Sequence, residues 1–133
     1  MYAAFGFDTT IKQAAGSAYN AGVLILQELK RFNDQYLQPF FFHTLNVGIG
    51  IHAGKVITGS IEINKRSQLT VMGLPVNIAA RLQAATRRLN NNFIASSYCY
   101  SLIQNKPSSP ILSISLKGIT EDQQIYLLGA SFD

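Results

Sequence analysis

The residues that most often build metal centres and nucleophilic sites are scarce in this sequence. Cys99 is the only cysteine in the 133-residue chain, so neither an internal disulfide nor a cysteine-based zinc site can form. His43 and His52 are the only histidines, and neither has a cysteine or carboxylate at metal-ligand spacing or supports a Ser-His-Asp arrangement. Among the seven acidic residues only Glu121 and Asp122 are adjacent, in a stretch typical of a turn. This chain is therefore expected to hold no two-metal carboxylate site of its own.

Charged side chains are also few, at 14% of residues against about 25% in ordinary soluble domains. Part of the exposed surface should then be apolar and covered by a partner. The net charge of +4 comes from eleven basic residues, scattered apart from the pairs Lys30-Arg31, Lys65-Arg66 and Arg87-Arg88. Nucleic-acid binding needs clustered basic residues or a recognisable module, so no nucleic-acid partner is expected, whereas a triphosphate would suit this charge.

No apolar run approaches the ~20 residues that span a bilayer. Residues 1–7 lack the basic start and the long apolar stretch of a signal peptide. With a single cysteine, these features predict a cytoplasmic protein that has no membrane segment in this chain. The length and the 47% hydrophobic content fit one domain with one core.

The first half of the hydrophobic pattern predicts a long helix and then a hairpin. Over residues 8–36, apolar or small residues recur at spacings of three and four, which indicates an amphipathic helix packed on a sheet. Residues 45–51 alternate as in a strand with one buried face. Residues 52–55 supply a turn into a second strand at 56–61, so these two strands are expected to pair with each other.

The second half predicts a further helix among short strands. A proline at position 75 suits the first turn of a helix that runs from about residue 76 to 89. The other expected elements are a polar connector at 63–67, strands at 68–72, 93–95, 111–116 and 124–128, a short helix at 97–103 and a loop at 105–110. This order fits an α+β sandwich with helices on one face of a mostly antiparallel sheet. A complete split βαβ unit also needs a strand before the first helix, and only residues 2–5 could supply part of it.

Two phosphate-binding motifs are only superficially present. The glycines at 48 and 50 are followed by a predicted strand and turn, whereas a dinucleotide-binding fingerprint must lead into a helix. Gly54-Lys55 lacks both the Ser/Thr and the upstream glycine of a P-loop. Neither motif is retained.

A longer pattern resembles the catalytic domain of class III adenylyl and guanylyl cyclases. The family pattern is a V-G-I-G-I-H-x-G hairpin followed by T-V-x-G-D-x-V-N-x-A-A-R-L. Here the matching runs begin at Val47, Leu69 and Val76, and the resemblance continues through Leu116-Lys-Gly118 to the last strand. It implies a single, partial nucleotide cyclase homology domain over residues 1–133, with a ferredoxin-like split βαβ fold whose first strand or strands are missing.

The resemblance also assigns roles to four side chains. Arg81 and Asn77 would be catalytic residues, with Arg81 stabilising charge on the α-phosphate in the transition state and Asn77 holding the ribose. Thr70 and Lys117 would bind substrate, at the purine and at the terminal phosphates. Helical spacing independently places Asn77 and Arg81 on one face. Without the family pattern, Arg81 would be an ordinary surface arginine.

Several departures from the family pattern affect the expected function. Residues 1–6 resemble the strand that follows the family's G-D-G turn, so both metal-binding aspartates and the purine-contacting lysine would lie upstream of residue 1. Leu74 replaces a common Asp or Asn. The implied parent is an adenylate cyclase, a phosphorus–oxygen lyase of intracellular signal transduction, which converts ATP to 3′,5′-cyclic AMP and pyrophosphate.

The catalytic site of such an enzyme lies between two head-to-tail subunits and uses two Mg or Mn ions. This chain would supply one half, as a homodimer or beside another cyclase domain, and would be inactive alone. Thr70 favours ATP, but without its usual lysine partner GTP stays open. The alternative is a catalytically degenerate cyclase-homology module that binds a nucleotide or a partner.

Overall fold

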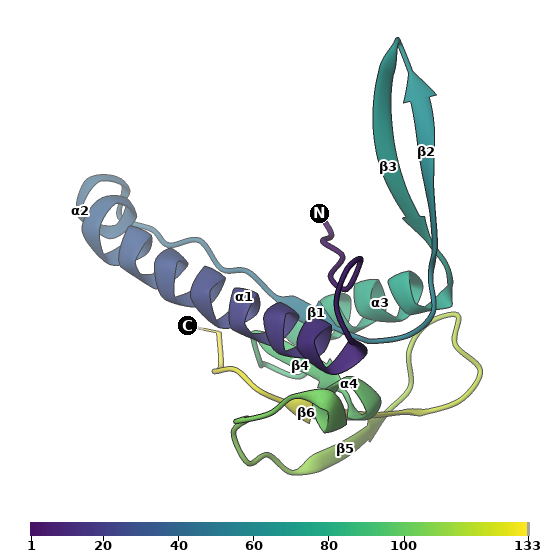
Figure 1. Ribbon diagram of the computed structural model, residues 1–133. Coiled ribbons are helices and arrows are strands. Elements are labelled where there is room, and N and C mark those ends of the chain that lie inside the picture. The colour runs from purple at the N-terminus through teal and green to yellow at the C-terminus, as the bar shows by residue number, and fades with distance from the viewer. Residues whose placement is uncertain (133) are drawn as a thin grey trace.

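The computed structural model describes residues 1–132, which form helices and short strands around one sheet, with a separate hairpin (Figure 1). In chain order the elements are α1 (Ile11–Phe32), the π-helical turn η1 (Asn33–Leu37), α2 (Gln38–Phe41), β1 (Ile49–Ile51), β2 (Ile57–Ile63), β3 (Arg66–Met72), α3 (Leu74–Arg88), β4 (Phe93–Ser96), α4 (Ser97–Leu102), β5 (Ile111–Ile114) and β6 (Gln123–Leu127). The predicted α+β class is confirmed. No helix in the described part of the chain combines the length and apolar character that a membrane span requires.

The first helix is shorter than predicted at its start and is extended at its end. Thr10 and Gln13 form a capping box, with the Thr10 hydroxyl accepting from the Gln13 N–H at 3.2 Å, so α1 begins at Ile11. Beyond Phe32 the helical path continues through η1 into α2. Pro39 therefore lies in the first turn of α2, where its missing N–H is tolerated, and does not follow the end of the helix.

The main sheet has the strand order β1-β4-β6-β5. β1 pairs with β4 in parallel, while the β4·β6 and β6·β5 pairs are antiparallel, so the sheet is mixed and mostly antiparallel. The predicted pairing of the strand at 45–51 with the strand at 56–61 is wrong. The backbone of Ile49–Ile51 pairs instead with residues 93–95.

β2 and β3 form the hairpin that projects from the body in Figure 1. They pair from Ile57 with Met72 to Ile63 with Arg66. The turn consists of Asn64 and Lys65, whose φ angles of 51° and 62° suit the two-residue hairpin turn that matches the twist of the strands. Most of the connector predicted at 63–67 is therefore strand.

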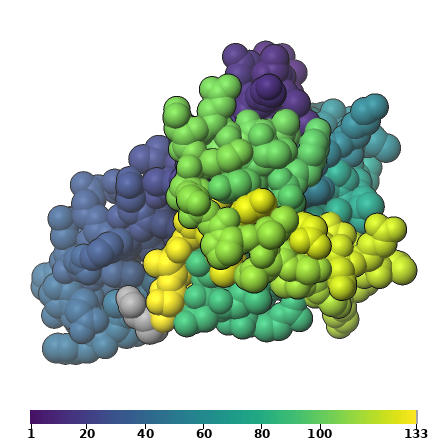
Figure 2. All heavy atoms as spheres, turned by 90° about the horizontal axis from the view of Figure 1, so that it is seen from below, coloured from purple at the N-terminus to yellow at the C-terminus, as the bar shows by residue number. Residues whose placement is uncertain are grey.

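Helices cover both faces of the sheet, which corrects the prediction of helices on one face only. All four residues of β4 are buried, and successive strand residues point to opposite faces. Ile94 packs with Ile78 and Leu82 of α3. The ring of Phe93 stacks on Tyr19 of α1, with centroids 5.8 Å apart. A strand buried on both sides requires a layer on each side. Figure 2, seen from below, shows α4 and the C-terminal strands in the middle of this face and α2 to one side.

Gly50 fixes the depth at which α3 lies on the sheet. A Cβ atom at this position would lie 2.6 Å from the Ala79 carbonyl oxygen and 2.8 Å from Leu82 Cβ. Only a hydrogen atom therefore fits between β1 and the backbone of α3. This close packing holds the exposed side of α3, including Asn77 and Arg81, at a fixed distance from the sheet.

The remaining predicted elements are found with shifted ends. The helix expected from residue 76 begins at Leu74, and the predicted short helix and last strands correspond to α4, β5 and β6. Residues 2–5 form no strand.

Candidate functional site

The exposed side of α3 brings together two of the predicted residues. Asn77 and Arg81 are both exposed and lie four positions apart, away from the buried stripe that includes Ile78 and Leu82. Within residues 1–132 neither side chain has a hydrogen bond or an ion pair inside the chain. A carboxamide and a guanidinium are thus held side by side with their hydrogen-bonding capacity free for a ligand.

Thr70 belongs to the hairpin and not to the helix. It lies on β3 opposite Gly59, is half-buried, and precedes Gly73, the residue that caps the N-terminus of α3, by three positions. The Gly73 φ of 141° turns the chain sharply from the strand into the helix. Thr70 therefore lies at the base of the hairpin, close along the chain to the end of α3 that carries Asn77.

Lys117 lies in a tight turn between β5 and β6. The Ile119 N–H donates to the Leu116 carbonyl oxygen at 3.0 Å, and Gly118 has a φ of 78°. An i to i+3 hydrogen bond with φ near +80° at the third residue is the geometry of a type II turn, in which Lys117 occupies the second position. Its side chain is exposed.

The turn is attached to α3 by two kinds of contact. Leu116 is 4% exposed and packs in the cluster that contains Ile78 and Leu82, and Ile119 packs against the same cluster. On the exposed side, Arg88 Nη2 donates to the Ser115 carbonyl oxygen at 2.9 Å. The segment that carries Lys117 therefore runs beside α3, so that Lys117 and Arg81 belong to the same side of the body.

The hairpin exposes an apolar face that includes Thr70. Because paired residues share a face and side chains alternate along a strand, Ile57, Ile61, Ile63 and Met72 point to the same side as Thr70. Their exposed fractions are 70%, 44%, 54% and 51%. A two-stranded hairpin whose exposed face is largely apolar is marginal in water by itself.

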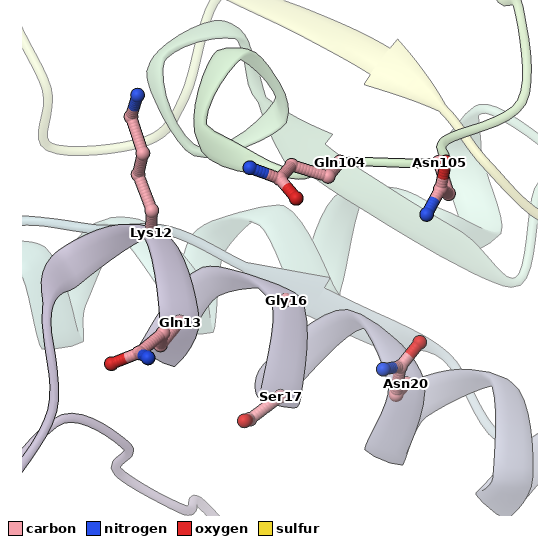
Figure 3. A pocket seen from close by; sticks show the side chains of 7 residues that line it. All are labelled: Lys12, Gln13, Gly16, Ser17, Asn20, Gln104 and Asn105. Atoms are coloured by element: carbon pink, nitrogen blue, oxygen red, sulfur yellow. The ribbon is translucent and has the colours of Figure 1, made fainter.

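Two hollows in the molecule lie away from these residues. One of about 350 Å³ lies between α1 and the loop after α4 and is lined by Lys12, Gln13, Gly16, Ser17, Asn20, Gln104 and Asn105 (Figure 3). The other, of about 500 Å³, lies between the second half of α1, residues 44–47 and residues 128–131. Neither hollow is lined by Thr70, Asn77, Arg81 or Lys117.

The described residues do not fit a metal site. Across residues 1–132 no group of three or more His, Cys, Asp and Glu side chains is placed to hold a metal ion. His52 is engaged elsewhere, because its Nδ1 is 2.7 Å from the Ser96 hydroxyl, the N-cap of α4. Burial lowers the pKa of His52, which favours its neutral form.

Sequence reasoning missed the contribution of Arg88 and of the turn. Arg88 follows Arg81 by seven positions, two helical turns, and this spacing is the one signal that placed both on the same side of α3. Nothing in the local pattern indicated that Arg88 would bind the carbonyl of Ser115, 27 positions away.

The comparisons with known proteins agree on one family. The adenylate and guanylate cyclase catalytic domain family matches residues 1–129. An adenylate cyclase of Anabaena cylindrica is 32% identical over 119 residues, which cover 82% of this chain and 23% of that protein. Among solved structures, the adenylyl cyclase CyaB from P. aeruginosa has a TM-score of 0.80 and 26% identity, with 96% of this chain and 66% of that chain covered.

A second solved structure, of a guanylyl cyclase, shares the fold. Its TM-score is 0.79 at 23% identity, and the match covers 97% of this chain and 64% of that chain. The chain thus spans about two thirds of the length of these solved cyclase chains and under a quarter of the Anabaena protein.

Proposed function

Since the chain belongs to the adenylate and guanylate cyclase catalytic domain family, we propose that it forms the nucleotide-holding part of an adenylyl cyclase whose parent converts ATP to 3′,5′-cyclic AMP and pyrophosphate. The observation that carries this proposal is the exposed side of α3, where Asn77 and Arg81 have no partner among residues 1–132 and lie on the helix beside the turn that presents Lys117. In the reaction, the ribose 3′-oxygen attacks the α-phosphorus. The bond from that phosphorus to the bridging oxygen breaks, and pyrophosphate leaves.

Each side chain has a role that suits its chemistry. The planar guanidinium of Arg81 donates to α-phosphate oxygens as charge develops on them in the transition state. The carboxamide of Asn77 hydrogen-bonds the ribose and so orients the 3′-oxygen for in-line attack. Lys117 supplies a positive charge to the terminal phosphates, and the Thr70 hydroxyl contacts the purine edge. Thr70 favours adenine, and we propose ATP over GTP on that ground.

The family's metal ions, Mg or Mn, are not assigned to this chain. Residues 1–132 do not fit such a site, so the ligands would come from outside this part of the chain. These ions would supply charge neutralisation on the phosphates.

We propose that the working site is completed by a second cyclase subunit, either another copy or a related domain. The apolar face of the hairpin supports this, because Ile57, Ile63 and Met72 are at least half exposed on the side that carries Thr70. A partner packed on that face would exclude water around the purine and supply the missing acids.

Complementation tests this function directly. The purified chain is mixed with a family cyclase domain that retains its metal-binding acids but has alanine at its position equivalent to Arg81, and cyclic AMP is measured with ATP and Mn²⁺. Each component alone should be inactive, and the mixture should be active. Arg81→Ala in this chain should lower the complemented kcat by about 10²–10³-fold, the loss typical of removing one transition-state donor.

Arg87→Ala is the matched control, because Arg87 lies on the same helix but contacts the Phe132 ring at 4.3 Å. It should leave the complemented rate unchanged. Robust cyclic AMP synthesis by the chain alone, or complementation that is indifferent to Arg81→Ala, would contradict the proposal.

A second candidate, a degenerate module that binds nucleotide or partner without catalysis, is favoured by one observation: the absence of a metal-ligand cluster from residues 1–132. Such a module would bind a fluorescent ATP analogue yet give no activity with any complementing partner. Titration of that analogue beside the complementation assay separates the two candidates.

A further inference from the structure

We infer that Gly118 and Arg88 are positioning residues that hold Lys117 against the phosphate-binding side of α3, an inference that rests on the function proposed for Lys117. A lysine has a long, flexible stem and binds phosphate as a point charge, so its contribution depends on where its backbone is anchored. Three interactions anchor the turn that carries Lys117.

The first two anchors lie within the turn. Its ends, Leu116 and Ile119, both pack on the core cluster beneath α3, and the Ile119 N–H to Leu116 carbonyl bond of 3.0 Å closes it. Gly118 occupies the position that needs a φ of 78°. A Cβ at Gly118 would meet nothing within 4 Å, so a substitution there is opposed by the backbone conformation and not by a collision.

The third anchor is the bond of 2.9 Å from Arg88 to the Ser115 carbonyl oxygen, two residues before Lys117. Arg88 is the last residue of α3, and a positive charge there also favours the helix C-terminus. Arg88 could thus affect activity by positioning Lys117 or by stabilising α3. Only the positioning effect should disappear when Lys117 is absent. Arg87 carries the same charge in the same helical turn and does not bind this segment, which makes it the matched control.

The test uses the complementation assay with the full chain. Gly118→Ala should lower kcat/KM for ATP on the order of tenfold, because a small displacement of the Lys117 ammonium strongly reduces the reaction rate. Gly118→Asn should recover most of the activity, since asparagine tolerates positive φ better than other residues. Gly16→Ala, another glycine with open space around its Cβ, should leave kcat/KM unchanged. Arg88→Ala should resemble Gly118→Ala, and Arg87→Ala should not.

A double-mutant cycle decides whether these residues act through Lys117. In a Lys117→Ala background, Gly118→Ala and Arg88→Ala should each change kcat/KM by less than about twofold. Losses that add in full to that of Lys117→Ala would overturn the inference while leaving the role of Lys117 intact. A Lys117→Ala variant with full complemented activity would instead refute the function proposed for Lys117, and the inference with it.

A second readout does not depend on activity. The Ile119 amide should exchange with deuterium slowly in the unmodified chain, faster in Gly118→Ala and in Arg88→Ala, and at the original rate in Gly118→Asn and Arg87→Ala. Rapid exchange at Ile119 in the unmodified chain would overturn the anchored turn, even if no complementing partner yields cyclic AMP.

Discussion

Replacing Gly22 with alanine tests whether α1 lies directly on the ring of Phe93. An added Cβ would lie 2.7 Å from Phe93 Cε1 and closer still to Cζ. The ring cannot easily move, because Phe93 is 1% exposed and its other contacts include the stacked ring of Tyr19. Alanine would therefore force a shift of the ring or of the helix.

The magnitude follows from two opposing effects. Glycine to alanine inside a helix stabilises by about 0.5–1 kcal/mol, because alanine loses less backbone entropy on folding. Overpacking a filled core costs about 1–3 kcal/mol, and the short distances at Gly22 place this site toward the upper value. Gly22→Ala should then destabilise by about 2 kcal/mol in net terms.

Gly16 supplies the internal control, because it lies in the same helix and an added Cβ there meets nothing within 4 Å. Gly16→Ala should raise the free energy of unfolding by about 0.5–1 kcal/mol, because only the smaller entropy loss of alanine in a helix applies there. The two variants should therefore differ by about 3 kcal/mol, which separates their urea midpoints by about 1 M or more.

The assay is urea unfolding followed by far-ultraviolet circular dichroism at one fixed protein concentration. In a Phe93→Leu background the shorter side chain should remove most of the penalty of Gly22→Ala. Equal stabilisation by Gly16→Ala and Gly22→Ala would refute the close packing of α1 on Phe93.

Three further predictions concern Asn33, His52 and Cys99. Asn33→Ala should lower the free energy of unfolding by about 1–3 kcal/mol, because Asn33 makes two bonds to the Leu45 backbone, at 2.8 and 2.9 Å; Asn20→Ala on the exposed side of α1 should have little effect in the same urea titration. Burial lowers the pKa of His52 below 6.5, so the unfolded chain binds the proton more readily than the folded chain. The contribution of neutral His52 to the free energy of unfolding should be complete above pH 6.5 and decline as the pH falls toward the folded-state pKa. His52→Gln should flatten this dependence in urea titrations from pH 7.5 to 5. Burial raises the pKa of Cys99 to about 11, so its thiol should react with a disulfide reagent at pH 8 far more slowly than glutathione does, and equal rates would contradict its burial.

Periodicity predicted the helices and strands better than their pairing. The spacing of apolar residues located α1 and α3 because one face of each helix is buried. The pairing of β1 could not be read in the same way, since its partner β4 lies more than forty residues away and a strand pattern does not specify a neighbour. The hairpin turn was missed because Asn64-Lys65 lacks the glycine that usually marks this turn.

In the candidate site, too, the sequence predicted the arrangement within one helix but not the contacts between distant segments. Asn77 and Arg81 share a helix, so their common face follows from a spacing of four. The attachment of the Lys117 turn to α3 depends on Leu116 and Arg88, whose partners are distant in the sequence. Tertiary contacts of this kind carry no local signal.

Association of the protein should affect how well ordered the projecting β2–β3 hairpin is. Its strands contact chiefly each other, so the second subunit proposed above would add stability to the hairpin by packing on Ile57, Ile63 and Met72. A partner that binds only the ordered hairpin stabilises it by mass action. With a second copy of this chain as the proposed partner, amide exchange along β2 and β3 should slow as the protein is concentrated, while exchange in β4 should stay constant. Exchange in the hairpin would then report association.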